Sequence, residues 1–61
     1  MAFLAVDKDG EEYIYDSEPV RYRYDRFPHW DCDTHWIELP DGSIEKLIGR
    51  KLTWDDEPVE I

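Results

Sequence analysis

The shortness of the chain constrains its fold more than any other feature. With 61 residues, it lies near the lower size at which a protein can bury enough apolar surface to fold without disulfides or metals. Three Trp, four Tyr and two Phe provide large burial per residue, which helps so short a chain to close a core. We therefore expect a single small domain, residues 1–61, with an aromatic-rich interior.

Two apolar, β-rich runs open the chain. Residues 2–7 (AFLAVD) and 11–16 (EEYIYD) are separated by Lys8-Asp9-Gly10, which predicts a β-hairpin. Residues 20–27 (VRYRYDRF) follow a turn around Pro19 and alternate with a period of two, which predicts a third strand.

The second half of the chain predicts shorter elements. Residues 37–39 read as a strand and 40–42 (PDG) as a turn. Ser43 is a suitable N-cap for a two-turn helix over residues 43–48, and Gly49 is suited to end it in a left-handed conformation. Residues 51–54 and 59–61 read as two further extended pieces.

These elements predict an α+β fold, mostly β: a small antiparallel sheet of about four strands with one short helix packed on its face. The expected core comprises Leu4, Val6, Ile14, Tyr22, Tyr24, Trp36, Ile37, Leu39, Ile44, Leu47, Ile48, Leu52 and Trp54.

The chain is strongly acidic, with 16 Asp and Glu, seven Lys and Arg and a formal charge of −9. This charge disfavours direct binding to nucleic acid or to an anionic membrane and favours a basic partner. The N-terminal stretch MAFLAVDKDG has no basic region, and its apolar run is too short for a signal peptide or a membrane span. We expect a cytoplasmic protein in which Cys32, the only cysteine, is a free thiol.

Three of the four arginines alternate with aromatics in residues 21–27 (RYRYDRF). Proteins that bind single-stranded nucleic acid use such a pattern. In this acidic chain we instead expect Arg21 and Arg23 to pair across the sheet with acids of neighbouring strands, which are Glu11, Glu12, Asp16 and Glu18.

The stretch HWDCDTHW, residues 29–36, is the one candidate for metal chemistry. On a straight strand the outer histidines would be roughly 20 Å apart, and neither the Cys-x-x-Cys nor the His-x-x-x-His spacing of a zinc site occurs. A site would require a tight loop that gathers His29, Asp31, Cys32 and His35. The simpler interpretation is a polar loop or exposed strand face between two core tryptophans, with no metal and no cofactor.

No catalytic motif stands out from the general acidity. Asp31 and Asp33 flank Cys32 and disfavour its thiolate, while Asp7 to Gly10 (DKDG) fit a hairpin turn better than a calcium loop. We therefore expect the protein not to be an enzyme.

Residues 37–61 (IELPDGSIEKLIGRKLTWDDEPVEI), together with FLAVDKDGEEYIYDSEPVR near the start, resemble short uncharacterised proteins of bacteriophages and prophages. The resemblance omits residues 22–36 and contains no catalytic motif. It implies a bacterial or phage cytoplasmic setting. Several small acidic phage proteins occupy the DNA-binding surface of a host enzyme, which suggests that role here by analogy alone.

The sequence thus favours a non-enzymatic acidic module that imitates nucleic acid and occupies a basic surface of a host protein. We expect its contact residues to be Asp31, Asp33, Trp54, Asp55, Asp56, Glu57 and Glu60, with an exposed Trp30 or Trp54 as anchor. Two alternatives are a metal-binding domain built on residues 29–35 and a homo-oligomer, such as a homodimer, that buries its surplus aromatics between chains.

Overall fold

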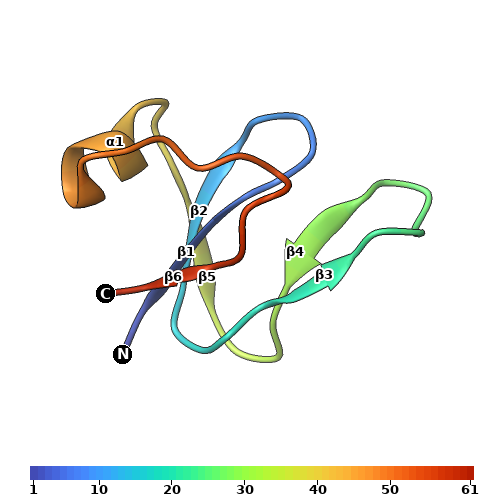
Figure 1. Ribbon diagram of the computed structural model, residues 1–61. Helices are drawn as coiled ribbons and strands as arrows, with labels where there is room; N and C mark the ends of the chain where they lie inside the picture. The colour runs from blue at the N-terminus through green and yellow to red at the C-terminus, as the bar shows by residue number, and fades with distance from the viewer.

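A computed structural model describes all residues, 1–61 (Figure 1). It contains six strands and one helix: β1 (Phe3–Val6), β2 (Glu12–Tyr15), β3 (Val20–Tyr22), β4 (His29–Asp31), β5 (Trp36–Leu39), α1 (Ser43–Ile48) and β6 (Val59–Glu60). The predicted mostly-β fold with an antiparallel four-stranded sheet and one short helix is confirmed. A second, two-stranded sheet was not expected.

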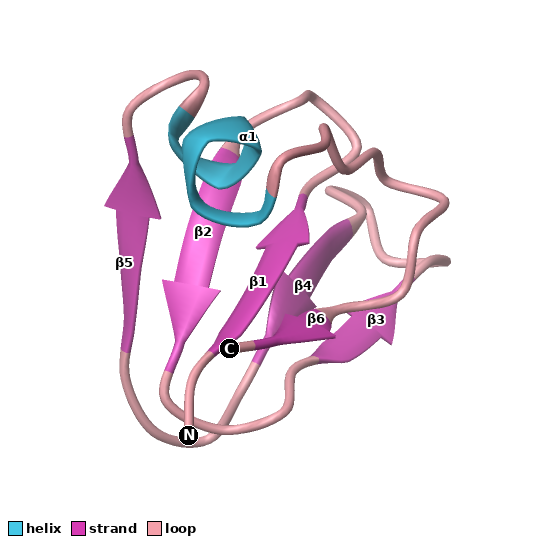
Figure 2. Ribbon diagram, turned by 60° about the vertical axis from the view of Figure 1, so that its left-hand side comes forward, coloured by secondary structure: helices cyan, strands magenta, loops and turns pink.

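The main sheet has the strand order β5-β2-β1-β6, and all its neighbouring strands are antiparallel. The predicted hairpin is present, with Phe3 opposite Tyr15 and Val6 opposite Glu12. Gly10 allows its tight connection, because its φ of 91° lies in the left-handed region that glycine tolerates best. β5 and β6 form the two edges, and in Figure 2 β5 stands at the far left of the sheet.

Strand β1 is buried on both of its faces, because the sheet is covered on both sides. Leu4 and Val6 pack with Ile44 and Leu52 on the side of α1. Ala5, on the other face, packs in a second cluster with Tyr15 and Trp30. β1 also contacts β4 of the small sheet, so the molecule has three layers, with the main sheet in the middle (Figures 1 and 2).

Eight of the thirteen residues of the predicted core are buried or partly buried, and five are exposed. Leu4, Val6, Ile44 and Leu52 are buried, and Ile14, Leu39, Ile48 and Trp54 are partly buried against the two clusters. Five expected core residues are exposed instead: Tyr22, Tyr24, Trp36, Ile37 and Leu47. Ala5 and Tyr15 are buried although they were not in the expected core, and Trp30 is buried as in the loop interpretation of residues 29–36, not exposed as an anchor.

The third strand is shorter than predicted. It ends at Tyr22, because the chain turns over residues 23–27 and returns as β4, with Tyr22 opposite His29. Tyr24 falls in this turn and is 96% exposed, so the alternation of residues 20–27 continued past the strand itself. The extended piece predicted at residues 51–54 is not a strand, and a turn begins at Trp54.

Helix α1 has the predicted bounds but not the predicted N-cap. Its N-cap position is Gly42, with no side-chain cap of its own, and the hydroxyl of Ser43 donates back to the carbonyl of Pro40. The carboxylate of Glu12 on β2 instead accepts the backbone N–H groups of Gly42 (2.7 Å) and Ile44 (2.8 Å). The C-terminal prediction holds, since Gly49 is left-handed, with φ 81°. No helix in the protein has the length or apolar character needed to cross a membrane.

Candidate functional site

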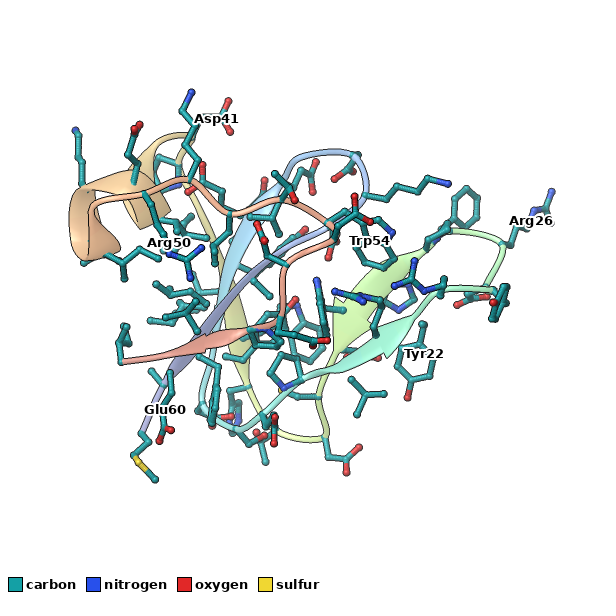
Figure 3. The ribbon with its side chains drawn as sticks, viewed as in Figure 1. Tyr22, Arg26, Asp41, Arg50, Trp54 and Glu60 are labelled. Atoms are coloured by element: carbon teal, nitrogen blue, oxygen red, sulfur yellow. The ribbon has the colours of Figure 1, made fainter.

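The acids expected to form one binding face are dispersed. Asp31 ends β4 and Asp33 lies in the bend after it, whereas residues 55–57 belong to the long segment before β6. In Figure 3 Glu60 lies at the lower left of the molecule, well apart from Trp54, another member of the expected set. The expected set therefore does not form a single surface, and only Asp55 and Trp54 of its members line the groove described below.

Asp56 has a structural task within its turn. One carboxylate oxygen of Asp56 accepts hydrogen bonds from the backbone N–H (2.7 Å) and the hydroxyl (3.2 Å) of Thr53. Its carbonyl oxygen accepts a hydrogen bond from the Arg21 guanidinium (2.9 Å). This residue ties the C-terminal segment to strand β3, so it is less available to a partner than expected.

The expected exposed anchor Trp30 is a core residue. It is 5% exposed, and its indole N–H donates to the carbonyl of Val6 at 2.9 Å. Trp54 meets it edge-on with ring centroids 5.8 Å apart, and the Arg21 guanidinium lies 4.5 Å from the Trp30 centroid and 5.3 Å from that of Trp54. Trp54 is half-buried, so only part of its ring can meet a partner.

The predicted cross-strand ion pairs of Arg21 and Arg23 are absent. Arg21 stacks on the two tryptophans because it lies opposite Trp30 in the register of β3 and β4, and stacking suits the planar guanidinium. Arg23 lies over the Trp54 ring at 6.0 Å. The only contacts within 4.0 Å between acidic and basic side chains in the protein involve histidines, namely His29 with Asp25 and His35 with Asp16.

The four candidate metal ligands are not brought together. His29 stacks on Tyr22, while the His35 ring lies 3.2 Å from Asp16. Asp31 accepts the backbone N–H of Cys32, and the Cys32 thiol points to the carbonyl of His35. No group of three His, Cys, Asp or Glu side chains lies close enough to hold a metal ion. The segment contains strand β4, because Trp30 must reach the core.

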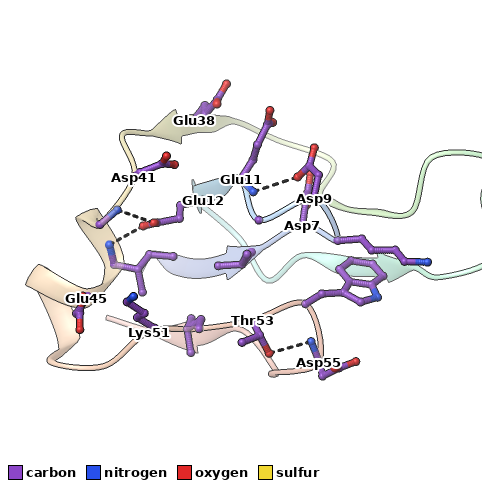
Figure 4. Close-up of a pocket in the computed structure, with 17 residues that line it drawn as sticks. Asp7, Asp9, Glu11, Glu12, Glu38, Asp41, Glu45, Lys51, Thr53 and Asp55 are labelled. Atoms are coloured by element: carbon purple, nitrogen blue, oxygen red, sulfur yellow. Dashed lines mark hydrogen bonds between the residues drawn. The ribbon is translucent and has the colours of Figure 1, made fainter.

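The acids gather instead in an open groove of about 1040 Å³ at the upper rim of the main sheet (Figure 4). The β1–β2 turn, the start of α1 and the segment before β6 form its walls, and apolar side chains of the core lie at its base. Eight of the residues that line this acidic groove are carboxylates, against two lysines, Lys8 and Lys51. The eight are Asp7, Asp9, Glu11, Glu12, Glu38, Asp41, Glu45 and Asp55.

Four of these eight carboxylates hold the fold. Glu12 caps α1, and Asp9 accepts the N–H of Glu11 within the hairpin turn. Asp7 accepts the N–H of Trp30 and so links the main sheet to β4. Glu11 accepts the hydroxyl of Tyr13. The other four, Glu38, Asp41, Glu45 and Asp55, have no side-chain hydrogen bond or ion pair within the protein and are exposed to solvent.

Burial and neighbouring charge shift several pKa values around this region. Partial burial raises the pKa of Asp7, and the negative charges of Asp9 and Glu11 add to the effect, although the hydrogen bond from Trp30 opposes it. The hydrogen bond to Glu11 raises the pKa of the Tyr13 hydroxyl. Burial and hydrogen bonding are thus the main causes of these two shifts, and the charges of neighbouring carboxylates add to both.

Outside the groove, Asp16 has the opposite shift. Hydrogen bonds from the Thr34 hydroxyl and the backbone N–H of His35 lower its pKa. Burial raises the pKa of the Tyr15 hydroxyl, which donates to the carbonyl of Trp30. Both interactions connect the main sheet with the β4 to β5 segment, so they stabilise the fold away from the acidic groove.

No family model matches the chain, and neither the comparison with curated proteins nor that with solved structures found a significant match. Of the residues that line the groove, the expected binding face included only Trp54 and Asp55, and Glu11 and Glu12 were expected to pair with arginines instead. The pairing of β1, β2 and β5 was the missing information, because it joins carboxylates from four separate segments.

Proposed function

We propose that the protein is a non-enzymatic binding module that presents its acidic groove to a basic surface of a partner protein, in the position that nucleic acid would occupy. The observation that carries the proposal is the group of four solvent-exposed groove carboxylates, Glu38, Asp41, Glu45 and Asp55, none of which forms an ion pair with a Lys or Arg of the chain within 4.0 Å. Their charge is available to a partner, whereas internal ion pairs would have offset it.

Rigidity supports this proposal. The groove walls are fixed by the Glu12 cap on α1 and by the Asp7 contact to Trp30, so a partner need not order them on binding. The four free carboxylates come from separate segments and are presented together as one fixed cluster of negative charge. A fixed array of this kind favours a surface that evolved to bind nucleic acid, and the phage or bacterial cytoplasm suggested by the resemblance supplies many such surfaces.

The test compares two variants that each remove three negative charges and take the formal charge from −9 to −6. The groove variant combines Asp41→Asn, Glu45→Gln and Asp55→Asn. The control variant combines Asp33→Asn, Glu57→Gln and Glu60→Gln, none of which lines the groove. The six side chains make no hydrogen bond that holds the fold, so both variants should melt as the wild type does.

Each immobilised protein is exposed to a bacterial lysate, and the retained proteins are identified and eluted with salt or with duplex DNA. We expect the wild type and the control variant to retain the same basic proteins, which DNA displaces, and the groove variant to lose them. Added salt should also elute them, because it shortens the distance over which exposed charges attract below the value of about 8 Å at physiological ionic strength. Equal retention by all three proteins would refute the proposed function.

A further inference from the structure

Strand β5 is an open edge of the main sheet, with a backbone that no other strand covers (Figure 2). The hydrogen bond from the Asp16 N–H to the His35 carbonyl shows which residues of β5 are hydrogen-bonded to β2. Because alternate residues of an antiparallel pair exchange hydrogen bonds, Ile37 and Leu39 bond to β2, while the N–H and C=O groups of Trp36 and Glu38 point away from the sheet. An extended segment could pair with these four groups.

The two faces of β5 differ in chemistry. Trp36 and Glu38 share one face; Trp36 is 50% exposed and Glu38 is exposed. A basic side chain there would meet both a carboxylate and an aromatic ring. On the other face Ile37 is 67% exposed. It borders a small, mostly apolar hollow of about 210 Å³ that Ala2, Ile14 and Trp36 also line, which suits an apolar side chain.

We propose that β5 binds an extended segment of the partner, added antiparallel as a fifth strand, in which basic residues facing Trp36 and Glu38 alternate with apolar residues facing Ile37. This inference rests on the proposed function and gives the mode in which the basic partner is recognised. Glu38 also lines the acidic groove, so the added strand and the groove would form one continuous contact.

Charge complementarity favours this occupant over a second copy of the chain. A two-fold pairing of β5 with itself would place Ile37 against Ile37, but each copy carries a charge of −9 and its own unpaired Glu38. A four-residue edge is also too short to bury the roughly 1,000 Å² that a specific stable interface needs. A basic segment removes the repulsion and extends its contact into the groove.

The probe is a synthetic heptapeptide in which four lysines alternate with three valines, added to the ¹⁵N-labelled protein. We expect shifts and slowed hydrogen exchange at the amides of Trp36 and Glu38. Directly opposite residues share a face, and the lysines opposite Trp36 and Glu38 form the hydrogen-bonded pairs because the N–H and C=O groups of these two residues point outward. The peptide's lysine N–H groups should therefore bond to β5. N-methylation of the lysine amides should weaken binding by at least about tenfold, whereas N-methylation of the valine amides should leave it unchanged.

A matched pair of protein variants provides the second measurement. Glu38→Gln removes the side-chain charge and keeps the backbone N–H. Glu38→Pro removes both the charge and the N–H, and it breaks no hydrogen bond to β2 because the N–H of residue 38 faces outward. We expect Glu38→Pro to bind the peptide about tenfold more weakly than Glu38→Gln. Thermal melts and the amide spectrum verify that each variant is folded, and the N-methylated peptides test the wild type directly.

The outcomes separate the two proposals. Equal binding of the lysine-methylated and unmodified peptides overturns strand addition, and so does a loss caused only by valine methylation, which would contradict the antiparallel arrangement. Shifts confined to groove amides, or a self-associated protein in sedimentation with β5 already protected, also overturn it. The proposed function has its own readout in the groove variant and its charge-matched control, so it can stand when the edge inference fails.

Discussion

Replacing Glu12 tests how the only helix is fixed to the sheet. In the structure one carboxylate accepts two N–H groups at the start of α1, at 2.7 and 2.8 Å, and Ile44 beside it is 1% exposed. Capping side chains contribute about 0.5–2 kcal/mol, and single hydrogen bonds to charged groups about 1.5–3 kcal/mol. Because the two bonds are not additive, we expect Glu12→Ala to lower the free energy of unfolding by about 2 kcal/mol.

This is a large loss for so small a domain. At roughly 0.05–0.15 kcal/mol per residue, a chain of this size has a free energy of unfolding of about 3–9 kcal/mol. Each kcal/mol changes the melting temperature of a domain this small by about 4–8 °C, so the melt should fall by about 8–16 °C. Urea unfolding followed by circular dichroism measures the free energy, and an unchanged m-value would show that the folded state remains compact.

Ser43→Ala is the matched control, because Ser43 is the cap that the sequence predicts. Its hydroxyl donates only to the carbonyl of Pro40 at an exposed position, so we expect a loss below about 1 kcal/mol. Glu12→Gln keeps one acceptor and should fall between the two. A Ser43→Ala loss as large as that of Glu12→Ala would refute the assignment of the cap to the neighbouring strand.

Four further predictions concern the packing, the pKa shifts and metal binding. Trp30→Phe should cost about 2–4 kcal/mol, because it leaves the carbonyl of Val6 without its donor and opens space in the core; a loss below 1 kcal/mol in urea unfolding would contradict this. Because the pKa of Asp7 is raised in the folded protein, the free energy of unfolding falls as pH rises through that pKa. Asp7→Asn should therefore be more stable than the wild type at pH 7, and this difference should disappear below the ordinary Asp value of 3.8. Asp16, with its lowered pKa, stabilises the fold above 3.8 and loses this contribution as pH falls. Asp16→Asn should therefore be the less stable variant at pH 7 and converge with the wild type in acid; urea midpoints across pH 2–7 that run parallel for both variants would contradict the shifts. Finally, stoichiometric zinc should leave the melting curve unchanged. A melting temperature that zinc raises and a chelator lowers again would instead support a metal site in residues 29–35.

Local signals were sufficient for the elements with short-range causes. The hairpin of β1 and β2 follows from the two β-rich runs on each side of Gly10, and the end of α1 follows from Gly49. Its N-cap could not be found in this way, because the capping carboxylate belongs to Glu12, 30 residues before Gly42. The cap depends on the position of β2 beside the helix, which local sequence does not encode.

The core was mispredicted where the sequence pattern had to indicate which face of a strand is buried. Alternation alone indicated that Leu4 and Val6 are buried, and the second covering layer, which buries Ala5, was not visible in the pattern. Trp36 and Ile37 are apolar but lie on an edge strand, where both faces retain access to solvent. Hydrophobic character therefore marked residues that a partner could use as well as residues of the core.

The net charge indicated a basic partner, but adjacency in sequence misled the choice of acids. Asp55, Asp56 and Glu57 are neighbours in the chain, yet Asp56 turns inward to Thr53 and only Asp55 lines the groove. The acidic groove forms through strand pairing, which brings Glu38 on β5 near the hairpin of β1 and β2.

The salt dependence of binding tests the central claim most directly. For one purified basic partner, the logarithm of affinity is measured against the logarithm of salt concentration with the wild type, the groove variant and the charge-matched control variant. If the free groove carboxylates carry the attraction, the slope should become shallower in the groove variant and stay at the wild-type value in the control. Identical slopes for both variants would show that only total charge matters, which would contradict the account.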